Sequence, residues 1–134
     1  MKLNELRDKV HAYAVNKGFY ETENEIDSLG VYNVTAIKHA FFAQKIALIH
    51  SELSEALEAD RNKFHADVEN VMDGNRIRQT VFDVHVKDTV EDELADAIIR
   101  ILDLCGCLNI DIEKHVELKM KYNELCNYKN DKEY

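Results

Sequence analysis

The fold predicted for this chain depends on two acid-rich stretches, residues 45–61, KIALIHSELSEALEADR, and residues 89–104, TVEDELADAIIRILDL. In both stretches apolar residues recur at the three- and four-residue spacing of an α-helix. A helix that is apolar around most of its circumference is typical of a buried helix, so we expect both stretches to lie in the core. The expected core stripes consist of Phe42, Ile46, Ile49, Leu53 and Leu57 in the first helix, and Val90, Leu94, Ala97, Ile101, Leu104 and Leu108 in the second.

Each stretch also carries two acids three residues apart, Glu52 with Glu55 and Glu93 with Asp96. Residues at this spacing share one face of a helix, so each pair lies beside apolar neighbours. Buried carboxylates repel one another and lose solvation unless a positive group lies between them. A site made only of carboxylate oxygens suits Mg²⁺, with Mn²⁺ as a substitute. The residues alone leave a second interpretation open, in which both pairs belong to a solvated helix face.

Composition favours a single all-α domain spanning residues 1–134. The chain has no proline and four glycines, and it is rich in residues that favour helices. A chain of this length can bury a hydrophobic core of its own. Its three cysteines, Cys105, Cys107 and Cys126, form no CxxC motif, so we expect free thiols in a reducing compartment.

The formal net charge of −9 argues against binding to nucleic acid or to an anionic membrane, because both require a basic surface. A phosphate-bearing substrate would need a cation to be accepted by such a chain. No signal peptide is visible at the N-terminus, and no apolar run is long enough to span a bilayer. We therefore expect a cytoplasmic protein.

The sequence predicts a four-helix bundle. Asn4 is expected to cap the first helix and Asp111 the fourth. Two segments between the helices are expected to lack helix: a polar connection over residues 21–33, and a loop over residues 62–87 with a small hairpin, a turn at Asp73-Gly74 and a short strand at residues 80–86. The expected helices span residues 4–17, 36–61, 89–109 and 112–128, and residues 129–134 form a loose tail.

The apolar faces of these helices exceed what one chain can cover. The helix over residues 36–61 has two apolar stripes, and the helix over residues 89–109 is apolar nearly all round. We therefore expect a homo-oligomer, most simply a symmetric dimer and otherwise a tetramer, that buries the excess.

Glu52-x-x-Glu55 followed by Glu93-x-x-Asp96 resembles the ExxE…ExxD signature of the MazG-like, all-α nucleoside triphosphate pyrophosphohydrolases. The similarity extends over SELSEALEADR, KDTVEDELADAIIRILDLCG and IDIEKHVELKMKYNELCNYK. The resemblance implies hydrolysis of a nucleoside triphosphate between its α- and β-phosphates, with the four acids binding Mg²⁺. One of Glu52 and Glu55 would then act as the catalytic general base.

The resemblance also suggests residues that meet the substrate. In the helix over residues 112–128 and just beyond it these are Lys119, Tyr122 and Asn123, followed by Tyr128 and Lys129. Lys45, on the stripe of Glu52, is a further candidate for phosphate binding or a charge partner of that acid. Phe19, Tyr20 and Phe41 could stack on a base, although aromatic residues beside a loop more often pin it to the core. For Arg100 we expect neutralisation of Asp96 and Asp103 rather than phosphate binding.

The leading hypothesis is a Mg²⁺-dependent pyrophosphohydrolase that removes unwanted nucleotides from the pool. Two alternatives stay open. The tail departs from the family pattern, with Cys126-Asn127 and Asn130-Asp131 where relatives carry basic residues. This departure is compatible with a catalytically weak nucleotide- or metal-binding regulatory module. The second alternative is a structural helical dimerisation domain whose acids lie in solvent.

Overall fold

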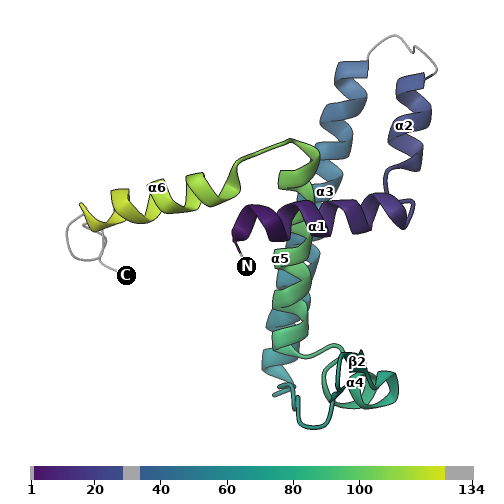
Figure 1. Cartoon of the computed structure of the whole chain (residues 1–134), viewed down its shortest axis with the longest axis vertical. Coiled ribbons are helices and arrows are strands. Elements are labelled where there is room, and N and C mark those ends of the chain that lie inside the picture. Colours follow the sequence, from purple (N-terminus) through teal and green to yellow (C-terminus); the bar gives the residue numbers. More distant parts are fainter. Residues whose placement is uncertain (1, 29–33, 126–134) are drawn as a thin grey trace. The chain divides into compact units, whose positions relative to one another are not determined.

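A computed structural model describes residues 2–28 and 34–125 of the chain (Figure 1). Within these residues the protein is all-α, as predicted, with one small two-stranded ribbon. The elements are α1 (Leu3–Asn16), α2 (Glu21–Ser28), α3 (Val34–Arg61), β1 (Met72–Asp73), β2 (Arg76–Ile77), α4 (Gln79–His85), α5 (Val90–Cys107) and α6 (Ile112–Glu124).

The chain forms two compact units. Unit 1 consists of Met1–Tyr20 and Leu102–Tyr134, and unit 2 consists of Glu21–Ile101. Helix α5 runs from unit 2 into unit 1, so its first twelve residues and its last six are described with different units. No helix in the described part of the chain is both long enough and apolar enough to cross a membrane.

In unit 1, polar contacts join the beginning of α1 to the beginning of α6. The Asn4 side-chain amide donates to Asp111 Oδ1 at 2.7 Å, and the Glu113 backbone N–H donates to Asn4 Oδ1 at 3.2 Å. The prediction that Asn4 caps α1 is therefore wrong, because α1 begins one residue earlier and Asn4 bonds to α6 instead. The prediction that Asp111 caps α6 is confirmed, since its carboxylate accepts from the Lys114 backbone N–H at 3.0 Å.

A glycine allows α5 to approach α1 closely within unit 1. A Cβ atom placed on Gly106 would lie 2.4 Å from the Cβ of His11, which is far below van der Waals contact. Beside this contact, the His11 ring nitrogen Nδ1 lies 2.8 Å from Asp103 Oδ1. Packing and a polar contact therefore hold the same two helices together.

In unit 2, α3 and residues 90–101 of α5 run side by side in opposite directions (Figure 1). The Val90 backbone N–H donates to the Phe64 carbonyl at 3.0 Å, so α5 begins near the place where α3 ends. The residues that these two helices bury include three small ones, Ala56, Ala59 and Ala97. Alanine lets two helices approach closely, which brings any longer side chains between them into contact.

The expected core stripes are only partly buried. Ile49 and Ala97 are buried, whereas Leu57 keeps 54% and Leu94 keeps 44% of its surface exposed. On each helix one group of exposed apolar residues lies about 90° around the axis from the buried face, at 100° per residue. Because the two helices are antiparallel, these flanks lie on the same side of the pair. We call this surface the α3–α5 apolar stripe, and it consists of Phe42, Leu53, Leu57, Leu94, Ile98 and Ile101.

The connections between the predicted helices contain more helix than expected. Helix α2 lies within the segment predicted to be a polar connection, and two ion pairs attach it to α3, Lys45 with Glu23 and Lys38 with Asp27, each at 3.5 Å. Residues 79–85 form α4, so the strand predicted over residues 80–86 is wrong.

The hairpin predicted at Asp73-Gly74 is confirmed. Strands β1 and β2 pair in antiparallel register, Met72 with Ile77 and Asp73 with Arg76, and Gly74 adopts a φ of +59°. Predictions for residues 29–33, for the end of the last helix at residue 128 and for the tail at 129–134 lie outside the described residues.

Candidate metal centre

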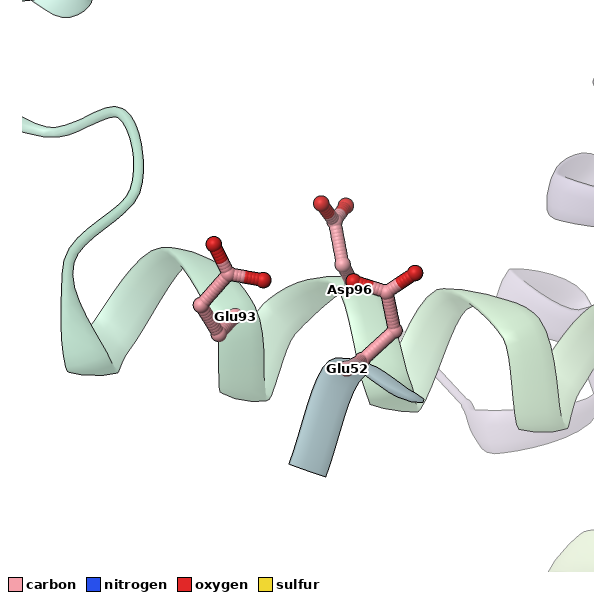
Figure 2. Close-up of side chains that lie close together, drawn as sticks. All are labelled: Glu52, Glu93 and Asp96. Atoms are coloured by element: carbon pink, nitrogen blue, oxygen red, sulfur yellow. The ribbon is translucent and has the colours of Figure 1, made fainter. Parts of the chain in front are cut away.

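Three of the four predicted acids come together between α3 and α5. Glu52 extends from α3, and Glu93 and Asp96 extend from successive turns of α5 (Figure 2). One carboxylate oxygen from each lies within 4.8 Å of the others. Only 7% of the surface of Glu52 and 5% of that of Glu93 is exposed, whereas Asp96 is exposed. The cluster therefore has a buried floor and opens to solvent at Asp96.

Local sequence explains why these side chains meet. Glu52 occupies the same helical face as Ile49 and Ala56, the face that α3 buries. Glu93 precedes Ala97 by one turn on the buried face of α5. Ala56 and Ala97, each one turn beyond an acid, are small, and they leave room for the longer carboxylate side chains between the two helices.

The electrostatics of the cluster are unfavourable in the absence of a cation. Burial, together with the charges of Glu55 and Glu52, raises the pKa of Glu93 to about 7. Burial and the charges of Asp92 and Glu52 also raise the pKa of Asp96. Glu93 lies in the first turn of α5, where the helix dipole favours a negative charge, yet burial and repulsion outweigh that effect.

Arg100 supplies a positive charge at the edge of the cluster. Its Nε donates to Glu52 Oε1 at 2.5 Å, across the two helices. The Arg100 charge also acts to lower the pKa of Asp96, which agrees in part with the expected role of this residue. Asp103, the other acid that Arg100 was expected to neutralise, contacts His11 and Tyr20 in unit 1.

Glu55, the fourth predicted acid, lies one turn beyond Glu52 but is not part of the three-carboxylate group. It is exposed and accepts a hydrogen bond from Ser51 Oγ at 3.2 Å. Its charge nevertheless acts on both Glu93 and Asp96, so it is a near neighbour of the cluster.

A second acidic group shares Glu93 and was missed in the sequence. Asp88, Asp92 and Glu93 also offer carboxylate oxygens within 4.8 Å of one another. In this group Asp92 Oδ2 accepts from the Asp88 backbone N–H at 3.0 Å, a contact that joins the loop to the beginning of α5. The run KDTVEDE, with acids at positions 88, 92 and 93, was the available signal.

The donor set of the three carboxylates fits a hard divalent cation. Carboxylate oxygen is the ligand that Mg²⁺ and Mn²⁺ prefer. Within the described residues no basic side chain forms an ion pair with Glu93, although this is one of the most buried charged groups in the chain. A cation held by Glu52, Glu93 and Asp96 would neutralise the repulsion that raises the pKa of Glu93 and of Asp96.

The predicted substrate residues are distributed over both units. In unit 2, Lys45 forms an ion pair with Glu23 on α2 at 3.5 Å. Phe41 lines a small hollow between α2 and α3, next to Ile26 and Ile37. The hollow also contains both acids of the α2–α3 ion pairs.

The remaining candidates belong to unit 1. Tyr20 is buried, and its hydroxyl donates to Asp103 Oδ2 at 2.7 Å, so the phenol serves packing rather than an open binding surface. Phe19 keeps 71% of its surface exposed. On α6 the Lys119 ammonium lies 4.7 Å from the centroid of the Tyr122 ring. Asn123 is exposed on the same helix, and Lys129 lies outside the described residues.

Comparison with models of known protein families, with curated proteins and with solved structures finds no match to this chain. The interpretation of the carboxylate cluster therefore rests on its own chemistry and on the resemblance of the quoted segments.

Proposed function

We propose that this protein is a Mg²⁺-dependent nucleotide pyrophosphohydrolase that cleaves nucleoside triphosphates between the α- and β-phosphates. The observation that carries the proposal is the meeting of Glu52, Glu93 and Asp96, two of them buried, with the pKa of Glu93 raised to about 7. A fold tolerates such repulsion more readily where a ligand relieves it, and raised pKa values of this kind cluster at functional sites. The resemblance of the surrounding sequence to the MazG-like enzymes adds support.

In this proposal each acid has a distinct role. Glu52, Glu93 and Asp96 hold the cation, which when bound neutralises the phosphate chain and lowers the pKa of a water molecule. Glu55 is the general base, because it is exposed, lies beside the cluster and is not a member of the three-carboxylate group. A carboxylate outside the metal group can accept the proton of an attacking water as the water adds to phosphorus.

The negative net charge of the chain bears on how it would recognise a nucleoside triphosphate. The chain carries a formal net charge of −9, so the protein as a whole repels a triphosphate, and a bound cation together with Arg100 would supply the attractive charge at the cluster. Recognition of the phosphate chain by the cluster is therefore the step that we expect to dominate binding. Removal of unwanted nucleotides from the cytoplasmic pool would be the physiological role.

The α3–α5 apolar stripe supports a homodimer. The six large apolar side chains of this stripe, carried by two antiparallel helices, remain exposed in one chain. Two copies packed stripe to stripe would bury them and would form a four-helix arrangement from two helices of each chain. A homotetramer, formed by two such dimers, would likewise bury apolar surface between copies.

Product analysis tests the proposed activity. A panel of canonical and modified nucleoside triphosphates is incubated with Mg²⁺ and the protein, and products are separated by ion exchange. We expect monophosphate and pyrophosphate from wild type and loss of both with Glu93→Gln and Asp96→Asn. Glu91→Gln is the matched control, since Glu91 lies on the same helix, is exposed and bonds to the Ala66 backbone N–H.

The other outcomes distinguish the alternatives. Orthophosphate as product would indicate a different phosphohydrolase. Mg²⁺- and nucleotide-dependent stabilisation of wild type without turnover would indicate a regulatory binding module. No turnover and no response to Mg²⁺ would leave a structural dimerisation domain.

A further inference from the structure

The contact between Arg100 and Glu52 raises a question about how the cluster takes up a cation. Arg100 Nε lies 2.5 Å from Glu52 Oε1, and the Glu52 side chain is only 9% exposed. Glu52 is also one of the three carboxylates that offer an oxygen to the cluster. The guanidinium and a cation therefore need the same buried carboxylate.

The positions of the two side chains make the contact exchangeable. Glu52 is enclosed between α3 and α5, and its carboxylate has little freedom to turn elsewhere. The Arg100 side chain is 42% exposed, so its guanidinium can leave Glu52 for solvent without disturbing the helix that carries it. For a long side chain at a partly exposed position, a change of rotamer has a small free-energy cost.

We propose that Arg100 is the internal counter-ion of the cluster, holding Glu52 in the cation-free protein and competing with a divalent cation for that carboxylate. This inference rests on the proposed cation site and adds a regulation to it. The guanidinium stabilises the cation-free cluster and thereby lowers its affinity for metal alone. Arg100 is a positioning residue in this account, because it acts through Glu52.

A phosphate-bearing ligand changes the competition between Arg100 and the cation for Glu52. A guanidinium released from Glu52 has lost a charged hydrogen-bond partner, and phosphate oxygens are the best replacement because they match its planar donors. The ligand thus offsets the cost of releasing Arg100. Cation and phosphate are then expected to bind cooperatively, and each raises the affinity for the other by the same factor.

Direct titration of Mn²⁺ by calorimetry, without nucleotide, tests the competition. We expect Arg100→Gln to bind Mn²⁺ about three- to tenfold more tightly than wild type, because a partly exposed charged hydrogen bond is lost from the competing state. Arg61→Gln is the matched control. Arg61 lies on α3, is exposed and pairs with Glu58 at 3.4 Å, so its loss removes the same charge away from the cluster.

A second titration follows inorganic pyrophosphate in the presence of saturating Mg²⁺. Here Arg100→Gln is expected to bind pyrophosphate more weakly than Arg61→Gln, since it lacks the released guanidinium. Circular dichroism of each variant confirms that it is folded.

Every outcome bears on the inference. Equal binding of Mn²⁺ by Arg100→Gln would overturn it, because the guanidinium would then not compete with the cation. Weaker binding would also overturn it, and would mean that Arg100 holds Glu52 in the orientation that a cation requires. If wild type binds Mn²⁺ but Arg100→Gln binds no more tightly, only this inference fails. If neither protein binds Mn²⁺, the cation site itself fails, and the proposed function fails with it.

Discussion

Replacing Glu93 by glutamine should stabilise the cation-free protein at neutral and alkaline pH. Glu93 is 5% exposed, and burial and the neighbouring acids raise its pKa to about 7. In the unfolded chain its pKa returns to the ordinary value of 4.5. Between these two values the unfolded state loses the proton first, so the free energy of unfolding falls as the pH rises.

The magnitude follows from the two pKa values. Below pH 4.5 Glu93 is protonated in the folded and in the unfolded protein, so it does not lower the free energy of unfolding. Above pH 7 it is ionised in both states, and the folded protein is destabilised by the full amount. The difference between a pKa of 4.5 and a pKa of about 7 corresponds to a loss of about 3 kcal/mol in the free energy of unfolding. Water reaches the cluster through the exposed Asp96 and screens part of this repulsion, so we expect about 1–2 kcal/mol.

Urea denaturation in EDTA at pH 5 and pH 8 measures the effect. Wild type and Glu93→Gln should differ little at pH 5, and the variant should be the more stable at pH 8. Glu91→Gln provides a control of opposite sign. The Ala66 backbone N–H holds the pKa of Glu91 below its ordinary value, so that variant should be less stable than wild type at pH 8.

At pH 8, saturating Mg²⁺ should make wild type more stable than Glu93→Gln. Only wild type retains all three carboxylates and gains stability by binding the cation. Equal or lower stability of Glu93→Gln at pH 8 in EDTA would refute the reasoning. Such a result would mean that Glu93 is stabilised as a carboxylate without a cation.

Three further predictions concern the oligomer and unit 1. Ile98→Lys should convert the proposed dimer to monomer in size-exclusion chromatography with light scattering, and a wild type that is itself monomeric at high concentration would contradict the role of the stripe. Tyr20→Phe removes the hydroxyl that donates to Asp103 at 2.7 Å and should lower the free energy of unfolding by about 1–2 kcal/mol. Gly106→Ala places a methyl group against His11 and should cost about 1–3 kcal/mol. Urea denaturation measures both, and an unchanged midpoint in either variant would remove that contact from the account.

Helical periodicity predicted the two central helices well, because their apolar residues recur over many turns. Helix α2, ETENEIDS, carries a single large apolar residue, Ile26, and so gave no periodic signal. Its attachment depends on ion pairs with α3 that only the folded chain creates. In α4 the β-branched residues favoured a strand, but surrounding structure overrode that weak preference.

The acid spacing predicted the membership of the candidate site more accurately than its geometry. Spacing placed Glu52 with Glu55 and Glu93 with Asp96 on one face of their respective helices, but only the structure shows that Glu52 joins Glu93 and Asp96 while Glu55 stays outside the group. The distance between Arg100 and Glu52 depends on how the two helices cross, which no local pattern encodes. For the same reason periodicity identified the α3–α5 apolar stripe as apolar but could not tell whether the chain covers it or another molecule does.

The most direct test of the account is the position of a bound cation. Crystals of the protein soaked with Mn²⁺ would be measured at the manganese absorption edge, where anomalous scattering locates the ion independently of any model. We predict an anomalous peak bonded to carboxylate oxygens of Glu52, Glu93 and Asp96, with Arg100 displaced from Glu52. A peak elsewhere, or none between α3 and α5 at saturating Mn²⁺, would contradict the central claim that these acids form a metal centre.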